Sequence, residues 1–196
     1  NILIGPFGET LLFDWGLAKR VGEREHDEWY AEPAARDVDE SDTLMTRQGQ
    51  VLGTPSYMAP EQIEPRFGEV DPASDVYALG AILFILLTGE KPYRGNAQEI
   101  MDQKATDDPS PSPRDRAVGK LLPPELVAIC EKAITKDKTK RFTDAAGFAE
   151  ELRAYRDGRL VSVYAYSRSE LLKRFVARNK AAVITAGAMI LSILGG

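Results

Sequence analysis

The twelve residues from Val76 to Leu87 are almost continuously apolar, and they constrain the fold more than any other part of the sequence. The stretch is too short to span a bilayer, which needs about 20 apolar residues. It is also too uniform for a surface helix, which keeps one polar face. We therefore expect a helix that is buried on all sides. Ser74 and Asp75 are expected to cap its start, and Thr88 with Gly89 to end it.

The composition fits one folded domain of ordinary size followed by a tail. The chain has 196 residues, of which 43% are hydrophobic and 28% are charged, so a packed core is feasible. The net charge of −5 argues against a nucleic-acid-binding surface over the whole chain, and we expect no nucleic-acid partner. The single cysteine, Cys130, cannot form an intrachain disulfide, and its place in an apolar helical stripe predicts a core residue.

Further helices and one hairpin are predicted from local patterns. Residues 95–105 predict a short surface helix, residues 124–134 carry an apolar stripe at helical spacing, and residues 143–155 predict a last helix. Near the start, two short apolar runs flank the Gly- and Pro-containing residues 5–9, which predicts a β-hairpin. Residues 23–42 are rich in Glu and Asp and predict a mobile loop. The expected fold class is mainly α with a small β-hairpin.

The composition changes after residue 157, where we expect the folded domain to end. Residues 158–180 predict a basic connector. Residues 181–196 are apolar or small, with Thr185 and Ser192 as mild exceptions, and we expect this run to be the start of a transmembrane helix. The basic residues before it predict that its N-terminal side is cytoplasmic. The alternative is a hydrophobic helix docked on a core or on a partner.

Two motifs stand in a fixed order along the chain. Asp-Trp-Gly at 14–16 follows an apolar run, and Gly-Thr-Pro-Ser-Tyr-Met-Ala-Pro-Glu at 53–61 follows a long polar segment. Taken alone, the first is an ordinary strand-end carboxylate and the second a turn built by Gly and Pro. Together with Ser-Asp-Val-Tyr-Ala-Leu-Gly at 74–80 and Arg141, they make residues 1–157 resemble the serine/threonine protein kinase family, with residues 14–61 as the activation segment.

This resemblance implies the C-terminal lobe of a kinase that transfers the γ-phosphoryl group of ATP to Ser or Thr hydroxyls of proteins, with ATP and Mg²⁺ as cofactors. Asn1 and Asp14 match the family positions that hold Mg²⁺ against the ATP phosphates, and both offer the hard oxygen ligands that this ion prefers. Gly16 would allow the backbone to turn sharply after Asp14. Trp15 stands where the family usually has Phe, which leaves open how the packing sets active and inactive states.

Four further positions carry family roles. Thr54 resembles the hydroxyl that bridges the catalytic Asp in serine/threonine kinases. Glu61 matches a carboxylate that pairs with an Arg far down the chain, and Arg141 matches that Arg. Asp75 matches a residue that accepts hydrogen bonds from the catalytic-loop backbone, and its alternative interpretation is a plain helix cap. Lys138 replaces the Pro that the family usually has, which would loosen a turn without affecting the chemistry.

Three hydroxyls in the long polar segment are candidate phosphorylation sites, namely Ser41, Thr43 and Thr46. A phosphate adds charge and three acceptor oxygens, and it can order a loop against a basic pocket. Thr46, beside Arg47, is the first choice among them. The alternative for each is a solvated loop hydroxyl. His26 is the only histidine, and we assign it no metal or catalytic role.

A kinase domain followed by a basic connector and an apolar run resembles the bacterial receptor-like kinases of the eukaryotic type. It implies a single-pass cell-membrane protein with a cytoplasmic kinase domain, protein substrates and activation as a homodimer. The Gly-rich loop, strand Lys and catalytic Asp of the family have no counterpart in the sequence. We therefore expect the 196 residues by themselves to be inactive, and the expected activity belongs to the intact protein. Two alternatives stay open, a membrane-anchored pseudokinase or scaffold and an unrelated helical interaction domain anchored to the membrane.

Overall fold

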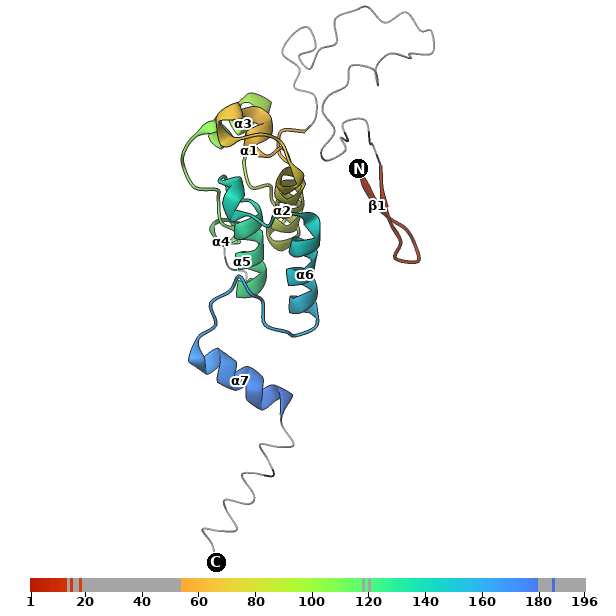
Figure 1. Ribbon diagram of the computed structural model, residues 1–196, viewed down its shortest axis with the longest axis vertical. Coiled ribbons are helices and arrows are strands. Elements are labelled where there is room, and N and C mark those ends of the chain that lie inside the picture. The colour runs from red at the N-terminus through yellow and green to blue at the C-terminus, as the bar shows by residue number, and fades with distance from the viewer. Residues whose placement is uncertain are drawn as a thin grey trace, which may run out of the picture.

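The computed structural model describes residues 1–13, 15, 18, 54–117, 119, 121–179 and 185. These residues form a β-hairpin, a body of helices and a further helix, α7, close to the C-terminal end (Figure 1). The mainly helical composition and the single small sheet agree with the fold class expected from the sequence.

The hairpin joins β1 (Ile2–Ile4) to β2 (Thr10–Leu12) in an antiparallel pair, with Leu3 opposite Leu11. Gly8, with a φ of 86°, lies in the connecting turn, where its left-handed backbone requires a residue without a Cβ. The predicted hairpin is therefore present. All six strand residues are exposed.

The helical body is built around one long helix. Its elements are α1 (Pro60–Ile63), η2 (Pro65–Phe67), α2 (Pro72–Thr88), α3 (Ala97–Ala105), α4 (Pro113–Arg116), α5 (Pro124–Ala133), η3 (Lys138–Lys140) and α6 (Ala145–Arg156). Helices α5 and α6 pack against α2 and against each other, while α1 contacts α3 at the end of the body where α2 begins (Figure 1). This arrangement places residues 54–61 directly above the start of α2.

The N-cap of helix α2 lies three residues before Ser74, the first of the two predicted caps. Asp71 is the N-cap, and its side chain accepts a hydrogen bond from the backbone N–H of Ala73 at 2.8 Å. The prediction is therefore correct in part: Ser74 belongs to the capping box, since its hydroxyl accepts from the N–H of Asp71 at 3.3 Å, but the N-cap itself is Asp71 and not Ser74 or Asp75, because Pro72 favours the first helical position. The predicted end is correct, since Gly89 closes the helix in a left-handed conformation with a φ of 82°.

Most of α2 is buried, as expected from its apolar sequence. Val76, Tyr77 and Phe84 have no exposed surface. The expectation of burial on all sides is nevertheless wrong, because Leu86 is 77% exposed. The packed neighbours α5 and α6 cover part of the circumference of α2 and leave Leu86 outside their contact.

The close approach of α2 and α5 depends on a glycine. A Cβ on Gly80 would lie 2.7 Å from the Cβ of Ala133 and 2.8 Å from Cγ2 of Ile134, so a larger residue here would force the surrounding atoms to shift. The Cys130 thiol beside this contact is buried and points to the carbonyl of Gly80, and burial raises its pKa. Cys130 is thus the core residue that the sequence predicts.

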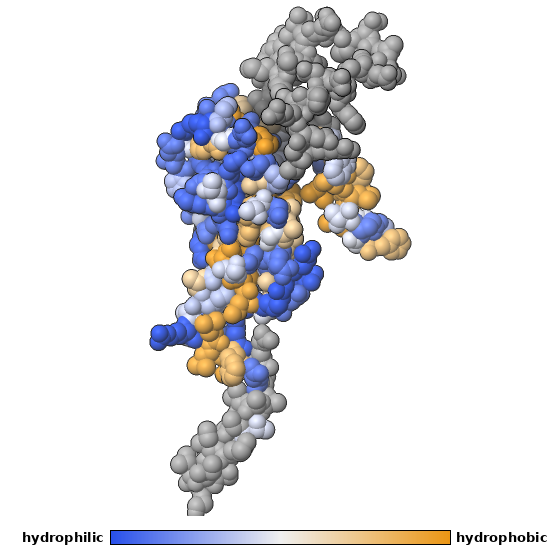
Figure 2. Space-filling view, in the orientation of Figure 1, coloured by the Kyte–Doolittle hydropathy of each residue, from blue (hydrophilic) through white to orange (hydrophobic). Residues whose placement is uncertain are grey.

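Helix α7 (Arg168–Arg178) lies within the predicted connector of residues 158–180. Arg174 binds Glu125 of α5, which ties the helix to the body. Its apolar side chains Leu171, Leu172, Phe175 and Val176 are exposed. Figure 2 shows hydrophobic residues gathered on this helix and on the hairpin. No helix among the described residues is long and apolar enough to cross a membrane. The predicted span of residues 181–196 lies, apart from Thr185, outside the described residues.

Candidate functional site

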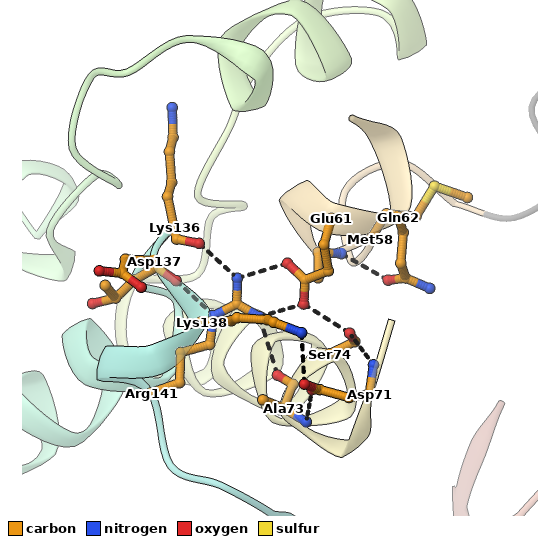
Figure 3. Close-up of polar contacts among 12 residues, drawn as sticks. Met58, Glu61, Gln62, Asp71, Ala73, Ser74, Lys136, Asp137, Lys138 and Arg141 are labelled. Carbon is orange, nitrogen blue, oxygen red and sulfur yellow. Dashed lines mark hydrogen bonds and ion pairs between the residues drawn. The ribbon is translucent and has the colours of Figure 1, made fainter. Parts of the chain in front are cut away.

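A buried ion pair joins Glu61, the last residue of the second motif, to Arg141, which lies 80 residues later in the sequence. Arg141 donates from Nη1 to Oε1 of Glu61 at 2.7 Å and from Nη2 to Oε2 at 2.8 Å (Figure 3). Both side chains are fully buried. Two parallel bonds between a guanidinium and a carboxylate fix the direction of both groups as well as their distance. The structure therefore brings together the two residues that the family resemblance pairs.

The other donors of Arg141 are also satisfied, which a buried charge requires. Nε donates to the carbonyl of Thr135 at 2.6 Å, Nη1 to that of Ala73 at 3.1 Å and Nη2 to that of Lys136 at 3.0 Å. Ser74 adds a hydrogen bond from its hydroxyl to Oε1 of Glu61 at 2.7 Å. The pair thus connects α1, the start of α2 and the segment before η3 in one network (Figure 3).

Glu61 stays ionised in this network. Burial by itself raises the pKa of a carboxyl group, but the hydrogen bonds from Arg141 and Ser74 outweigh it, so the pKa of Glu61 lies below its ordinary value. The charged form is therefore the stable one at neutral pH, and it gives α1 a negative charge in its first turn, where a helix favours it.

The segment before Glu61 forms a tight turn. The backbone N–H of Tyr57 donates to the carbonyl of Thr54 at 3.0 Å, and the side chain of Gln62 accepts from the N–H of Ala59 at 2.8 Å. Thr54 is exposed at the start of the turn, whereas Ser56 is buried. The side chain of Thr54, predicted to contact the catalytic Asp, is therefore accessible from outside the helical body. Its contact with a catalytic Asp stays a prediction.

A residue that the sequence analysis missed lies beneath this turn. Lys104 of α3 is fully buried, and its ammonium donates to the carbonyls of Pro55 at 2.8 Å, Ser56 at 3.3 Å and Met58 at 2.5 Å. One signal could have revealed it: Lys104 follows the apolar Ile100 by four residues and so shares its helix face. Both side chains are buried.

Lys138 has a larger role than the predicted loosening of a turn. Its ammonium donates to the carbonyl of Glu69 at 2.6 Å and to Oδ2 of Asp71 at 2.7 Å, which ties η3 to the residue that caps α2 (Figure 3). Burial by itself raises the pKa of Asp71, but the hydrogen bonds from Lys138 and the N–H of Ala73 outweigh this effect. The pKa of this carboxyl therefore lies below its ordinary value. A proline at position 138 would lack this ammonium.

The remaining predicted site residues lie apart from this network or outside the described residues. Asn1 is exposed at the start of the hairpin, and Asp75 is exposed in the first turn of α2. Asp14, Gly16, Ser41, Thr43 and Thr46 lie outside the described residues. No group of three or more His, Cys, Asp or Glu side chains in the described part of the chain could hold a metal ion. The predicted roles of these residues stay predictions.

Residues 1–155 match the protein kinase domain family. The chain belongs to the protein kinase family. Similar proteins include the serine/threonine-protein kinase PknD of Chlamydia muridarum, 33% identical over 163 residues that cover 81% of this chain and 17% of the relative. The corresponding PknD of Protochlamydia amoebophila is 30% identical over 159 residues, with 81% and 16% coverage. The probable serine/threonine-protein kinase PknB of Bifidobacterium longum is 29% identical over 181 residues, with 92% and 23% coverage.

These findings confirm the predicted membership of a bacterial kinase family of the eukaryotic type. The chain spans less than a quarter of the length of the three relatives. The network around Glu61 and Arg141 fastens the end of the segment 54–61 to the start of α2. Thr54, at the other end of this segment, is exposed.

Proposed function

We propose that the intact protein is a serine/threonine protein kinase that transfers the γ-phosphoryl group of ATP to Ser or Thr hydroxyls of other proteins. The observation that carries the proposal is the family match over residues 1–155. The relatives are named serine/threonine-protein kinases, which supports the choice of acceptor. The exposed hydroxyl of Thr54 on an anchored turn supports a docking place for a polypeptide substrate.

The hairpin supports Asn1 and Asp14 as the residues that would hold Mg²⁺. The backbone N–H of Phe13 donates to the carbonyl of Asn1 at 2.9 Å, so the two ends of the hairpin lie side by side, and Asp14 follows Phe13 directly in the sequence. An amide oxygen and a carboxylate are suitable ligands for this hard cation. When bound, Mg²⁺ and ATP would supply the phosphoryl group and neutralise its charge. The residues of the chain would orient the nucleotide and the acceptor.

The test is a phosphate-transfer assay on the intact protein with Mg²⁺, labelled ATP and peptides that carry Ser, Thr or Tyr. We expect label on Ser or Thr only, and loss of transfer in Asp14→Asn. Asp102→Asn, an exposed carboxylate on α3, is the matched control and should keep full transfer. Absence of Mg²⁺-dependent transfer in the wild type would reject the kinase and favour the scaffold, while an unaffected Asp14→Asn variant would reject the assigned metal residue.

Regulation and location follow the family resemblance. The apolar run of residues 181–196, preceded by basic residues, supports a single membrane span with a cytoplasmic kinase domain. In cells, the intact protein should resist carbonate extraction from membranes and lose this resistance when residues 181–196 are deleted. Autophosphorylation at Ser41, Thr43 or Thr46 should appear by mass spectrometry after incubation with Mg-ATP. Sedimentation at several concentrations tests the proposed homodimer.

A further inference from the structure

Lys104 carries a buried charge that has no acidic partner among the described residues. Its side chain has no exposed surface, and none of the ion pairs formed in that part of the chain involves it. Burying an ammonium group costs free energy unless other groups replace its water. The replacement comes from the carbonyl oxygens of Pro55, Ser56 and Met58. All three belong to one turn, so these hydrogen bonds are kept only while that turn keeps its shape.

Two aromatic rings complete the surroundings of the ammonium. Nζ of Lys104 lies 4.9 Å from the ring centre of Tyr77 in α2 and 5.4 Å from that of Tyr93, distances at which a cation is attracted to the ring face. The guanidinium of Arg141 lies 5.0 Å from the ring of Tyr77 as well. The ring of Tyr77 is therefore shared by two cations, one that holds Glu61 and one that holds the turn before it.

We propose that Lys104 is a positioning residue that fixes residues 54–58 in the shape that receives a protein substrate. This inference rests on the proposed kinase function. Glu61 and Arg141 fasten the C-terminal end of the segment, and Lys104 fastens its middle from below. Thr54 remains exposed at the other end, where a polypeptide can approach it. Without the ammonium, three carbonyls of the turn would lose their common donor, and the turn would gain conformational freedom.

A second buried lysine shows what a purely structural role looks like. Lys136 donates to the carbonyl of Gln103 at 2.9 Å, the carbonyl of Thr106 at 2.8 Å and the hydroxyl of Thr106 at 3.1 Å. It therefore caps the C-terminal end of α3, and its ammonium donates to no acceptor in residues 54–58. Both lysines are buried and both donate to three acceptors, and they differ in the segment that they hold.

The experiment compares Lys104→Met with Lys136→Met in the intact protein. The kcat and KM are measured for a Ser or Thr peptide and for ATP, and hydrogen exchange is measured over residues 54–59. In Lys104→Met we expect the peptide KM to rise about tenfold or more while the ATP KM stays within about twofold, because only substrate docking is lost. The amides of residues 54–58 should exchange faster. Lys136→Met should leave the peptide KM and this exchange unchanged.

Several outcomes overturn the proposal. One is that Lys104→Met keeps the peptide KM and the exchange rate of the wild type. Another is that Lys136→Met shows the same rise in peptide KM and the same faster exchange as Lys104→Met. If Lys104→Met does not fold, Lys104→Gln replaces it, because glutamine keeps a donor without the charge. We then expect a smaller rise in the peptide KM, and an unchanged peptide KM overturns the proposal. If the wild type transfers no phosphate, the proposed function fails, and the exchange of residues 54–58 in Lys104→Met still decides whether the lysine holds the turn.

Discussion

The hairpin and the helical body both bring apolar side chains together, but only the body removes them from water. Ile4 is 74% exposed and Phe7 is 94% exposed, whereas Phe84 in α2 has no exposed surface. A two-stranded hairpin is at best marginally stable by itself, while packed helices bury enough apolar area to be cooperative. The stability of the described residues therefore comes mainly from the helical body, and the shape of the turn at 54–61 depends on that body.

The largest expected effect comes from breaking the ion pair in the helical body. Arg141→Ala leaves the carboxylate of Glu61 buried without its partner, and we expect the free energy of unfolding to fall by about 3–5 kcal/mol. Urea denaturation followed by circular dichroism measures it. Arg94→Ala is the control, since the pair of Arg94 with Glu90 is exposed and should contribute about 1 kcal/mol or less. Equal losses in the two variants would contradict the prediction.

The stability of the body should also depend on pH through Lys104. Burial lowers the pKa of this ammonium to about 7, with smaller contributions from Arg141 and Lys136, and the rings of Tyr77 and Tyr93 face the same group. The unfolded chain keeps the proton up to about pH 10.4, so it binds more protons than the native state above pH 7 and stability rises with pH.

The rise can reach about 2 kcal/mol between pH 7 and 9, because one pKa unit corresponds to about 1.36 kcal/mol and the native lysine is already partly neutral at pH 7. The carbonyls around the ammonium favour its charged form and reduce the effect. Urea midpoints at each pH measure it, and Lys104→Met should lack this component. A wild type and a Lys104→Met variant with parallel pH profiles would show that the lysine does not titrate in this range.

A third prediction concerns the contact between α2 and α5. Gly80→Ala places a methyl group within 3 Å of Ala133 and Ile134, and we expect it to destabilise the body by about 1–3 kcal/mol through overpacking. Gly147→Ala in α6 is the matched control, because its Cβ would meet nothing closer than 3.6 Å. The control should be neutral or stabilising by up to about 1 kcal/mol, since alanine favours a helix. Thermal unfolding distinguishes the two.

The smallest effect is expected in the hairpin, where the loss of an exposed leucine can be compared with the loss of a buried leucine in α2. Leu3 is 53% exposed in β1, and Leu3→Ala should change the free energy of unfolding by about 0.5 kcal/mol or less. Leu83 in α2 is 9% exposed, and Leu83→Ala should cost about 2–5 kcal/mol. A large loss for Leu3→Ala in the same urea assay would show that the hairpin contributes to the cooperative unit.

Much of the helical body could be predicted from local patterns in the sequence. The apolar stretch at 76–87 predicts α2, and the stripe at 124–134 predicts α5, because the period of the side chains reports the buried face. The start of α2 lies earlier than predicted because Asp71 is the N-cap, with Ser74 as its partner in the capping box, and Pro72 favours the first helical position. The exposure of Leu86 could not be predicted, since an apolar residue does not reveal which neighbours reach it.

The candidate site was less accessible to sequence reasoning. Glu61 and Arg141 are 80 residues apart, and only the family resemblance pairs them, because no local pattern links such distant positions. Lys104 was missed because a lysine in a short amphipathic helix ordinarily faces water. Its burial depends on carbonyls of a turn almost fifty residues earlier, and such a contact becomes visible only in three dimensions.

The separation of Glu61 and Arg141 along the chain has a consequence for how the protein is made. The ribosome synthesises the N-terminal part first, and residues 54–61 emerge long before Arg141 does. Until Arg141 has left the exit tunnel, the carboxylate of Glu61 lacks the guanidinium that holds it in place. A nascent chain therefore cannot hold residues 54–61 in their final position, and premature release upstream of Arg141 yields a product in which Glu61 lacks its partner.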